Sequence, residues 1–246
     1  MDYKQTAEKI ERFIKQKTAG LEGAVLGVSG GIDSAVVAYL AVNALGKEKV
    51  HGLIMPYARN QNMNDGIELS QKLGMPYEVV GICHIVDSYE HKPAERYIKD
   101  YEEIDFFNNK TAKGNLMTRI RMCLLYGKAN KGNLMVLGTS NKTEMMLGYF
   151  TKYGDGGCDI EPIGDLYKTE VWELARYLGV DKKLIDKKPT ADLWEGQTDE
   201  GEIGASYQEM DAVLKGELTK GKVYDLVQEK IKNSEHKRRM PETCML

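Results

Sequence analysis

Residues 29–34, SGGIDS, combine residue types suited to holding a phosphate with a carboxylate, Asp33. The two glycines allow a tight turn that brings backbone N–H groups toward an anion, and the two serines add hydroxyl donors. A carboxylate repels polyphosphate unless a cation lies between them, so Asp33 is a candidate ligand of Mg²⁺ that bridges the phosphates. Alternatively, Asp33 only complements the dipole of a helix that follows, a contribution of about 0.3 to 1 kcal/mol.

The motif matches neither of the two common nucleotide-binding loops. A Walker A loop requires GxxxxGK[ST], and no lysine follows these glycines. The GxGxxG dinucleotide pattern is absent as well. The positive charge that accompanies a bound phosphate must therefore come from a cation or from elsewhere in the chain.

Apolar runs typical of buried β-strands alternate with helical patterns along the first part of the chain. The strand-like runs are residues 24–28, 50–55, 77–82 and 134–139. Helix-like segments precede and separate them at residues 3–17, 33–45, 62–73 and 114–130. This alternation predicts an α/β fold, a Rossmann-like parallel sheet with helices on both faces.

Polar segments follow the carboxyl ends of these strands, where ligands of parallel sheets bind. SGGIDS follows the first predicted strand, and SNKTE, residues 140–144, follows the fourth, ahead of a glycine-rich segment. Beyond residue 165 the strand pattern stops. There we expect helices joined by polar loops, over residues 168–178, 206–215 and 222–232.

Composition excludes several classes of partner. A net charge of −3 and a pI of about 5.9 argue against a nucleic-acid backbone as the main partner. No run approaches 18 apolar residues and the N-terminus is charged throughout, so we expect no membrane span and a cytoplasmic protein. The four cysteines lack CxxC spacing and fit reduced thiols. The length favours a single domain over residues 1–246.

SGGIDS in this strand, turn and helix context resembles the pyrophosphate-binding loop of the N-type ATP pyrophosphatases, also called adenine nucleotide alpha hydrolase-like proteins. These enzymes cleave ATP between the α and β phosphates to adenylate a substrate. Three later segments resemble the ammonia-dependent NAD synthetases within that superfamily. They are RIRMCLLYGKAN at 119–130, residues 137–179, and KPTADLWEGQTDEGEIG at 188–204.

The resemblance implies a ligase that forms a C–N bond in the final step of NAD biosynthesis. The nicotinate carboxylate of deamido-NAD would attack the α phosphate of ATP, and ammonia would then displace AMP. The cofactors implied are Mg²⁺ and, as co-substrate, ATP, and the state implied is a homodimer. Only about 23 residues precede the first predicted strand, so we expect no N-terminal glutamine amidotransferase domain.

The resemblance also carries functional roles onto residues of this sequence. For ATP binding it implies Gly27, Val28, Ser29, Gly30, Gly31, Ile32, Asp33, Ser34, Thr139, Lys168 and Thr190. For Mg²⁺ it implies Asp33 and Glu144, and for catalysis Asp33 and Lys168. For deamido-NAD it implies Arg119, Lys152, Asp159, His236 and Lys237. In this arrangement Lys168 supplies the positive charge that the glycine loop, residues 29–34, lacks.

The choice of Arg119 also rests on a helical projection of residues 114–130. One face of that helix is formed by Leu116, Ile120, Cys123, Leu124 and Gly127. Arg119 lies at the edge of this face and Arg121 points nearly opposite, so Arg119 is expected to reach inward. Alternatively, Arg119 extends along the edge of the core with its charge in water.

The sequence also allows other interpretations of these residues and of the function. Alternatively, Lys152, Asp159 and Lys168 are exposed loop charges, and the basic residues around His236 only complement the end of a helix. Two rival functions are adenylation of another acceptor, as in GMP synthetases or tRNA-modifying enzymes, and nucleotide binding by a regulator without catalysis. A tRNA enzyme would carry a basic module or a catalytic cysteine pair, and a regulator would not need metal-assisted departure of pyrophosphate.

Overall fold

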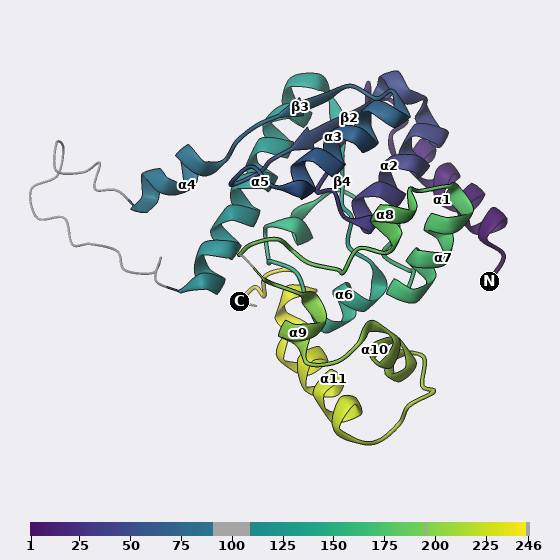
Figure 1. Cartoon of the computed structure of the whole chain (residues 1–246), viewed down its shortest axis with the longest axis vertical. Helices are drawn as coiled ribbons and strands as arrows, with labels where there is room; N and C mark the ends of the chain where they lie inside the picture. Colours follow the sequence, from purple (N-terminus) through teal and green to yellow (C-terminus); the bar gives the residue numbers. More distant parts are fainter. Residues whose placement is uncertain (91–108, 195, 245–246) are drawn as a thin grey trace, which may run out of the picture.

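A four-stranded parallel sheet lies at the centre of the computed structural model, which describes residues 1–90, 109–194 and 196–244 (Figure 1). The strands are β1 (Gly23–Gly27), β2 (Val50–Ile54), β3 (Tyr77–Val79) and β4 (Leu134–Leu137). Their order is β3-β2-β1-β4, so β1 is flanked on both sides, and Leu26 pairs with Gly52 in β2 and Leu137 in β4. The predicted parallel α/β fold is confirmed.

Helices cover both faces of the sheet, as the alternation of side chains along β1 requires. Ala24 and Leu26 belong to one apolar cluster, and Val25 belongs to a second. The first cluster is covered by α1 (Tyr3–Lys17), α2 (Ile32–Leu45), α3 (Gln61–Leu73) and α7 (Lys168–Leu178). The second is covered by α4 (Cys83–Glu90) and α5 (Lys110–Gly132). Burial on both faces explains why the strands are apolar throughout.

A third apolar cluster lies beside these layers, at the lower end of the view in Figure 1. It is formed by α6 (Lys142–Leu147), α9 (Asp199–Ile203), α10 (Tyr207–Leu214) and α11 (Lys222–Asn233). Trp172 on α7 packs against both this cluster and the first. Its ring and the ring of the buried Tyr207 lie edge to face, with their centroids 6.0 Å apart. As expected, no strand follows residue 165 in the described part of the chain.

The largest differences between predicted and observed boundaries are in β3 and α5. Strand β3 ends at Val79 instead of residue 82, although the backbone continues beside β2, with the Val80 N–H donating to the Ile54 carbonyl. Helix α5 extends beyond both ends of the predicted 114–130. Asn109 caps its start, and Asn133 ends it in the left-handed conformation. None of the helices in the described ranges is both long and apolar enough to cross a membrane.

Candidate active site

The carboxyl ends of the strands open onto a cavity of about 760 Å³. Its walls include four continuous segments, residues 27–34, 53–60, 137–140 and 187–194. The first three follow or end strands β1, β2 and β4, which is where ligands of parallel sheets bind. The fourth comes from the loop after α8 (Lys182–Ile185).

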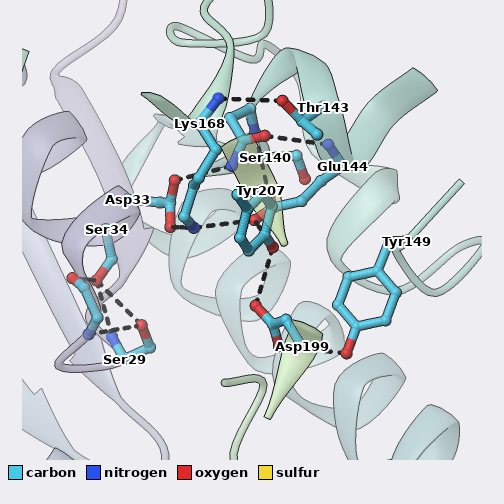
Figure 2. A network of polar contacts seen from close by, with 12 residues as sticks. Ser29, Asp33, Ser34, Ser140, Thr143, Glu144, Tyr149, Lys168, Asp199 and Tyr207 are labelled. Atoms are coloured by element: carbon cyan, nitrogen blue, oxygen red, sulfur yellow. Dashed lines mark hydrogen bonds and ion pairs between the residues drawn. The ribbon is translucent and has the colours of Figure 1, made fainter. Parts of the chain in front are cut away.

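The loop between β1 and α2 is folded by its own hydroxyl groups. Ser34 Oγ donates to the Gly31 carbonyl (3.0 Å), accepts from the Ser29 N–H (3.3 Å) and lies 3.0 Å from Ser29 Oγ. Gly30 has a φ of +75°, and a Cβ at this position would overlap the carbonyl oxygen of Asn62. These bonds within the loop fix its turn beside Asp33 (Figure 2).

Lys168 is the centre of a buried charge cluster that faces this loop (Figure 2). Its Nζ lies 2.5 Å from Asp33 Oδ2 and 3.2 Å from Glu144 Oε1, and the residue is only 1% exposed. Asn141 Nδ2 donates to the other oxygen of Asp33 (3.0 Å). Tyr207 lies with its ring 4.9 Å from the ammonium and its hydroxyl 3.3 Å from Glu144 Oε1. Two acids and one lysine thus converge at the cavity wall.

Glu144 and Lys168 lie in the first turns of α6 and α7. Glu144 is the third residue of α6, where it forms a capping box with Asn141. Lys168 is the first residue of α7, and its N–H donates to Thr143 Oγ1 of α6 (3.0 Å). Thr143 in turn donates to Asp211 of α10 (2.5 Å), so three helices are tied together behind the site.

Burial and charge act in opposite directions on these groups. Burial raises the pKa of Glu144 to about 7, although Lys168 opposes the shift. Burial alone would lower the pKa of Lys168, but the charges of Asp33 and Glu144 outweigh it and hold that pKa above the ordinary value. The lysine is therefore an ammonium at neutral pH. Burial also raises the pKa of the nearby Asp199, which lines the cavity.

Asp33 and Glu144 fit Mg²⁺ by their chemistry and position. Both carboxylates reach the same ammonium, and both line the cavity with side chains that stay partly exposed. Mg²⁺ is typically held by one or two carboxylates, with phosphate and water completing its octahedron. Among the described residues, no three His, Cys, Asp or Glu side chains are grouped to hold a metal by themselves. An ion at Asp33 and Glu144 would accordingly draw its remaining ligands from phosphate and water.

Every residue expected to contact ATP or Mg²⁺ lines this one cavity. The set comprises Gly27, Val28, Ser29, Gly30, Gly31, Ile32, Asp33, Ser34, Thr139, Glu144, Lys168 and Thr190. They come from five separate stretches of the sequence, and the fold brings them to one edge of the sheet. Their roles toward ATP and Mg²⁺ stay predictions.

The residues expected to bind deamido-NAD lie outside the cavity. Arg119 is exposed and donates to the Lys152 carbonyl (3.2 Å), and His236 is exposed as well. Lys237 donates to the carbonyls of Gly148 and Phe150, both at 2.7 Å. Arg119 and Lys237 thus contact the glycine-rich segment after β4, which contains Lys152. The roles of all four residues toward deamido-NAD stay predictions.

Asp159 also lies outside the cavity, with both carboxylate oxygens engaged within the chain. Tyr126 Oη donates to Oδ1 (2.8 Å), and the Val136 N–H donates to Oδ2 (2.8 Å). The side chain therefore fixes the glycine-rich segment to β4 and α5. A direct contact between Asp159 and a substrate would have to share these bonds.

The helical projection of α5 is wrong about the two arginines. Arg121 turns inward, lines the cavity and donates to the Met55 carbonyl (3.0 Å), whereas Arg119 is exposed. Burial lowers the pKa of Arg121. The projection centred the buried face near Cys123, which is exposed. The buried side chains instead surround the direction of Arg121 and all belong to the second apolar cluster: Met117, Ile120, Met122, Leu125 and Ala129.

Several residues of the site escaped sequence analysis. They are Asn141, Tyr149, Lys187, Asp199 and Tyr207. Asn141 had a readable signal, because Asn followed three residues later by Glu is a capping pattern. Tyr207 had none, since it reaches Glu144 across 63 residues of sequence.

Glu161, a buried acid behind the loop after β4, is expected to make the free energy of unfolding depend on pH. Glu161 Oε2 accepts from the Ser140 N–H (3.0 Å) and Oε1 accepts from Cys158 Sγ (3.1 Å), while burial raises its pKa from an ordinary 4.5 to about 7. Between these pH values the folded chain holds a proton that the unfolded chain has lost, so stability falls as pH rises from 4.5 to 7. Relative to wild type, Glu161→Gln is expected to gain stability over this range.

Urea unfolding midpoints at pH 5 and pH 8 check this expectation. Glu173→Gln, at an exposed carboxylate, is the control for the change in net charge. A Glu161→Gln variant whose midpoint follows the wild-type pH dependence would contradict the buried proton.

Comparison with known proteins places this geometry in a family. A family model described as NAD synthase matches residues 6–241. The chain belongs to the NAD synthase family. An NH(3)-dependent NAD(+) synthetase from Pyrococcus horikoshii is 47% identical to it, over 98% of this chain and 94% of the relative. The predicted family is thereby confirmed.

Two solved structures superpose along the whole chain. The NH3-dependent NAD synthetase from Campylobacter jejuni, in complex with the nitrate ion, has a TM-score of 0.79 and 33% identity, covering 100% of both chains. The NMN synthetase from Francisella tularensis has a TM-score of 0.88 and 36% identity, again over 100% of both. The fold of the chain thus agrees with that of the family.

Proposed function

We propose that this protein is an ammonia-dependent NAD(+) synthetase, a ligase that uses ATP to amidate deamido-NAD in the final step of NAD biosynthesis. The observation that carries this proposal is the convergence of Asp33, Glu144 and Lys168 opposite the glycine loop. Such a site suits departure of pyrophosphate, because it offers backbone donors, an ammonium and two carboxylates for a cation. The family match supports the acceptor.

Two bond exchanges make up the proposed reaction. A carboxylate oxygen of the nicotinate group bonds to the α phosphorus of ATP. At the same time the bond between that phosphorus and the oxygen that bridges the α and β phosphates breaks, and pyrophosphate leaves. The nitrogen of ammonia then bonds to the acyl carbon as the bond to AMP breaks, and a proton is released. Positioning and neutralisation of charge supply most of the rate enhancement in such transfers.

Residues of this chain have distinct parts in that scheme. The backbone N–H groups at the start of α2, which the bonds within the loop do not use, donate to the departing pyrophosphate. Lys168 adds a positive charge at the point where negative charge accumulates. Mg²⁺, when bound, would be held by Asp33 and Glu144 and would neutralise phosphate charge. Thr139 and Thr190 line the same cavity and position the nucleotide.

We further propose that residues 1–246 act as one domain, as a cytoplasmic homodimer that uses free ammonia and binds neither nucleic acid nor membrane. The exposed positions of Arg119 and His236 support the homodimer, because a second copy would complete a dinucleotide site that one copy leaves open. Light scattering after size exclusion tests it, and a monomer at micromolar concentration would contradict it.

A second candidate substrate is the deamidated mononucleotide, nicotinate mononucleotide. The observation in its favour is the TM-score of 0.88 with the Francisella tularensis NMN synthetase. The two substrates share the nicotinate carboxylate that is adenylated, so the same chemistry serves both. They differ only in the adenylate half that the enzyme must bind.

One assay separates these proposals. Purified protein is supplied with ATP, Mg²⁺ and ammonium chloride, with either deamido-NAD or nicotinate mononucleotide, and the amidated product and pyrophosphate are followed together. A kcat/KM higher for deamido-NAD supports the synthetase named first, and a higher value for the mononucleotide supports the second. Pyrophosphate release only with xanthosine monophosphate or tRNA would overturn both.

A further inference from the structure

A second charged cluster lies beside the glycine loop, and the proposed reaction does not use it. Lys187 Nζ donates to the Gly30 carbonyl (3.0 Å) and to Asp65 Oδ2 (2.6 Å). Asp65 lies on α3 and is 4% exposed, and its Oδ1 accepts from Gln61 (3.0 Å) and Lys183 (3.2 Å). Lys187 thus joins a buried carboxylate of α3 to the backbone of the loop.

The carbonyl that Lys187 contacts belongs to the peptide between Gly30 and Gly31. The N–H of the same peptide, on Gly31, donates to Ser29 Oγ (3.2 Å), so both of its polar ends are fixed. Gly30 also lies against the backbone of Asn62 in the first turn of α3, where no side chain fits. The peptide is therefore held from three directions.

The orientation of the peptide between Gly30 and Gly31 matters for a bound anion, because a peptide carbonyl repels an anion and a peptide N–H attracts one. Two adjacent glycines permit this peptide to rotate at low cost. Rotation would turn a carbonyl oxygen toward the phosphates, where its partial negative charge repels them. An ammonium held on that oxygen opposes the rotation, since it would lose a charge-assisted hydrogen bond.

We propose that Lys187, anchored by Asp65, is a positioning residue for the pyrophosphate moiety of ATP: it fixes the peptide between Gly30 and Gly31 so that the Gly30 carbonyl stays turned away from the anion. This inference rests on the proposed function. Lys187 also lines the cavity, so a direct contact between its ammonium and a phosphate is the competing arrangement.

Asp65→Asn separates the two arrangements by the sign of its effect. If Lys187 positions the loop, loss of its ionic anchor lets the peptide rotate, and pyrophosphate binds more weakly. If Lys187 binds the phosphate directly, loss of the competing carboxylate frees its charge, and pyrophosphate binds more tightly. Asp65 does not line the cavity, so the variant changes Lys187 without removing a wall of the site.

The experiment is calorimetric titration with magnesium pyrophosphate, together with steady-state kinetics. Lys187→Met and Asp65→Asn are each expected to raise the Kd for pyrophosphate and the KM for ATP about tenfold, with the KM for deamido-NAD unchanged. Lys187→Arg keeps the charge and is expected to recover part of the affinity. Lys183→Met is the matched control, because Lys183 contacts the same Asp65 carboxyl and Glu68 but not the loop.

Each outcome decides one question. Wild-type affinity in Lys187→Met, tighter binding in Asp65→Asn, or an equal loss in Lys183→Met would overturn the positioning role and leave the proposed function intact. Wild-type protein that binds no pyrophosphate and forms no NAD would overturn the proposed function instead. Melting temperatures identify a variant that fails to fold, in which case Lys187→Arg and Asp65→Asn carry the test.

Discussion

An Asp33→Asn variant is expected to lose at least about a hundredfold in kcat/KM while it keeps the wild-type fold. Its amide oxygen can still accept from Asn141, so the start of α2 stays in place. Its amide nitrogen would face the ammonium of Lys168, and one of the two carboxylates proposed to hold Mg²⁺ would be gone. The loss is measured by NAD formation at saturating ATP over a range of Mg²⁺ concentrations.

The matched control is Asp165→Asn. Asp165 pairs with Lys142, but its side chain is 95% exposed and does not line the cavity. The control is expected to keep wild-type activity. An Asp33→Asn variant with more than half of the wild-type kcat/KM would contradict both the metal ligand and the role of the charge cluster.

Lys168→Met is expected to abolish turnover and to lower the free energy of unfolding by about 3 to 5 kcal/mol, because it leaves two carboxylates without their shared cation. Methionine retains much of the apolar contact with the Tyr207 ring, so the loss isolates the charge. For a chain of this length the melting temperature is expected to fall by about 10 °C. Thermal unfolding is measured in EDTA, so that no divalent cation replaces the ammonium.

A double variant provides the control for this prediction. Adding Glu144→Gln to Lys168→Met neutralises one of the two unpaired acids, so the double variant is expected to be more stable than Lys168→Met alone and equally inactive. Equal stability of the wild type and Lys168→Met would show that the buried carboxylates do not need the lysine.

The local parts of the site were predictable from sequence, and the long-range parts were not. The turn of SGGIDS follows from two glycines and two serines within six residues, and the structure places it between β1 and α2 as expected. The meeting of Lys168 with Asp33 spans 135 residues, and no local pattern encodes it. Only the family resemblance placed Lys168 in the site.

Two errors of the sequence analysis, the orientation of α5 and the omission of Lys187 and Asp65, have the same origin. The projection of α5 failed because its apolar face was centred on the exposed Cys123, and because the partner that holds Arg121 inward, the Met55 carbonyl, lies outside α5. Lys187 and Asp65 were not identified because each is an ordinary surface residue type, and their contact joins positions 122 apart. Periodicity predicts which elements form, whereas the contacts of a buried charge depend on how those elements pack.

The burial of Lys168 beneath Tyr207 ties activity to the local stability of one part of the molecule. Tyr207 belongs to α10 and the third apolar cluster, while Asp33 lies on α2, whose apolar side chains belong to the first. If α10 and α11 open at a lower free energy than the whole chain, water reaches the ammonium while the sheet is still folded. The temperature limit of the enzyme is then set by the least stable cooperative unit that touches the site, and an overall melting temperature overestimates it.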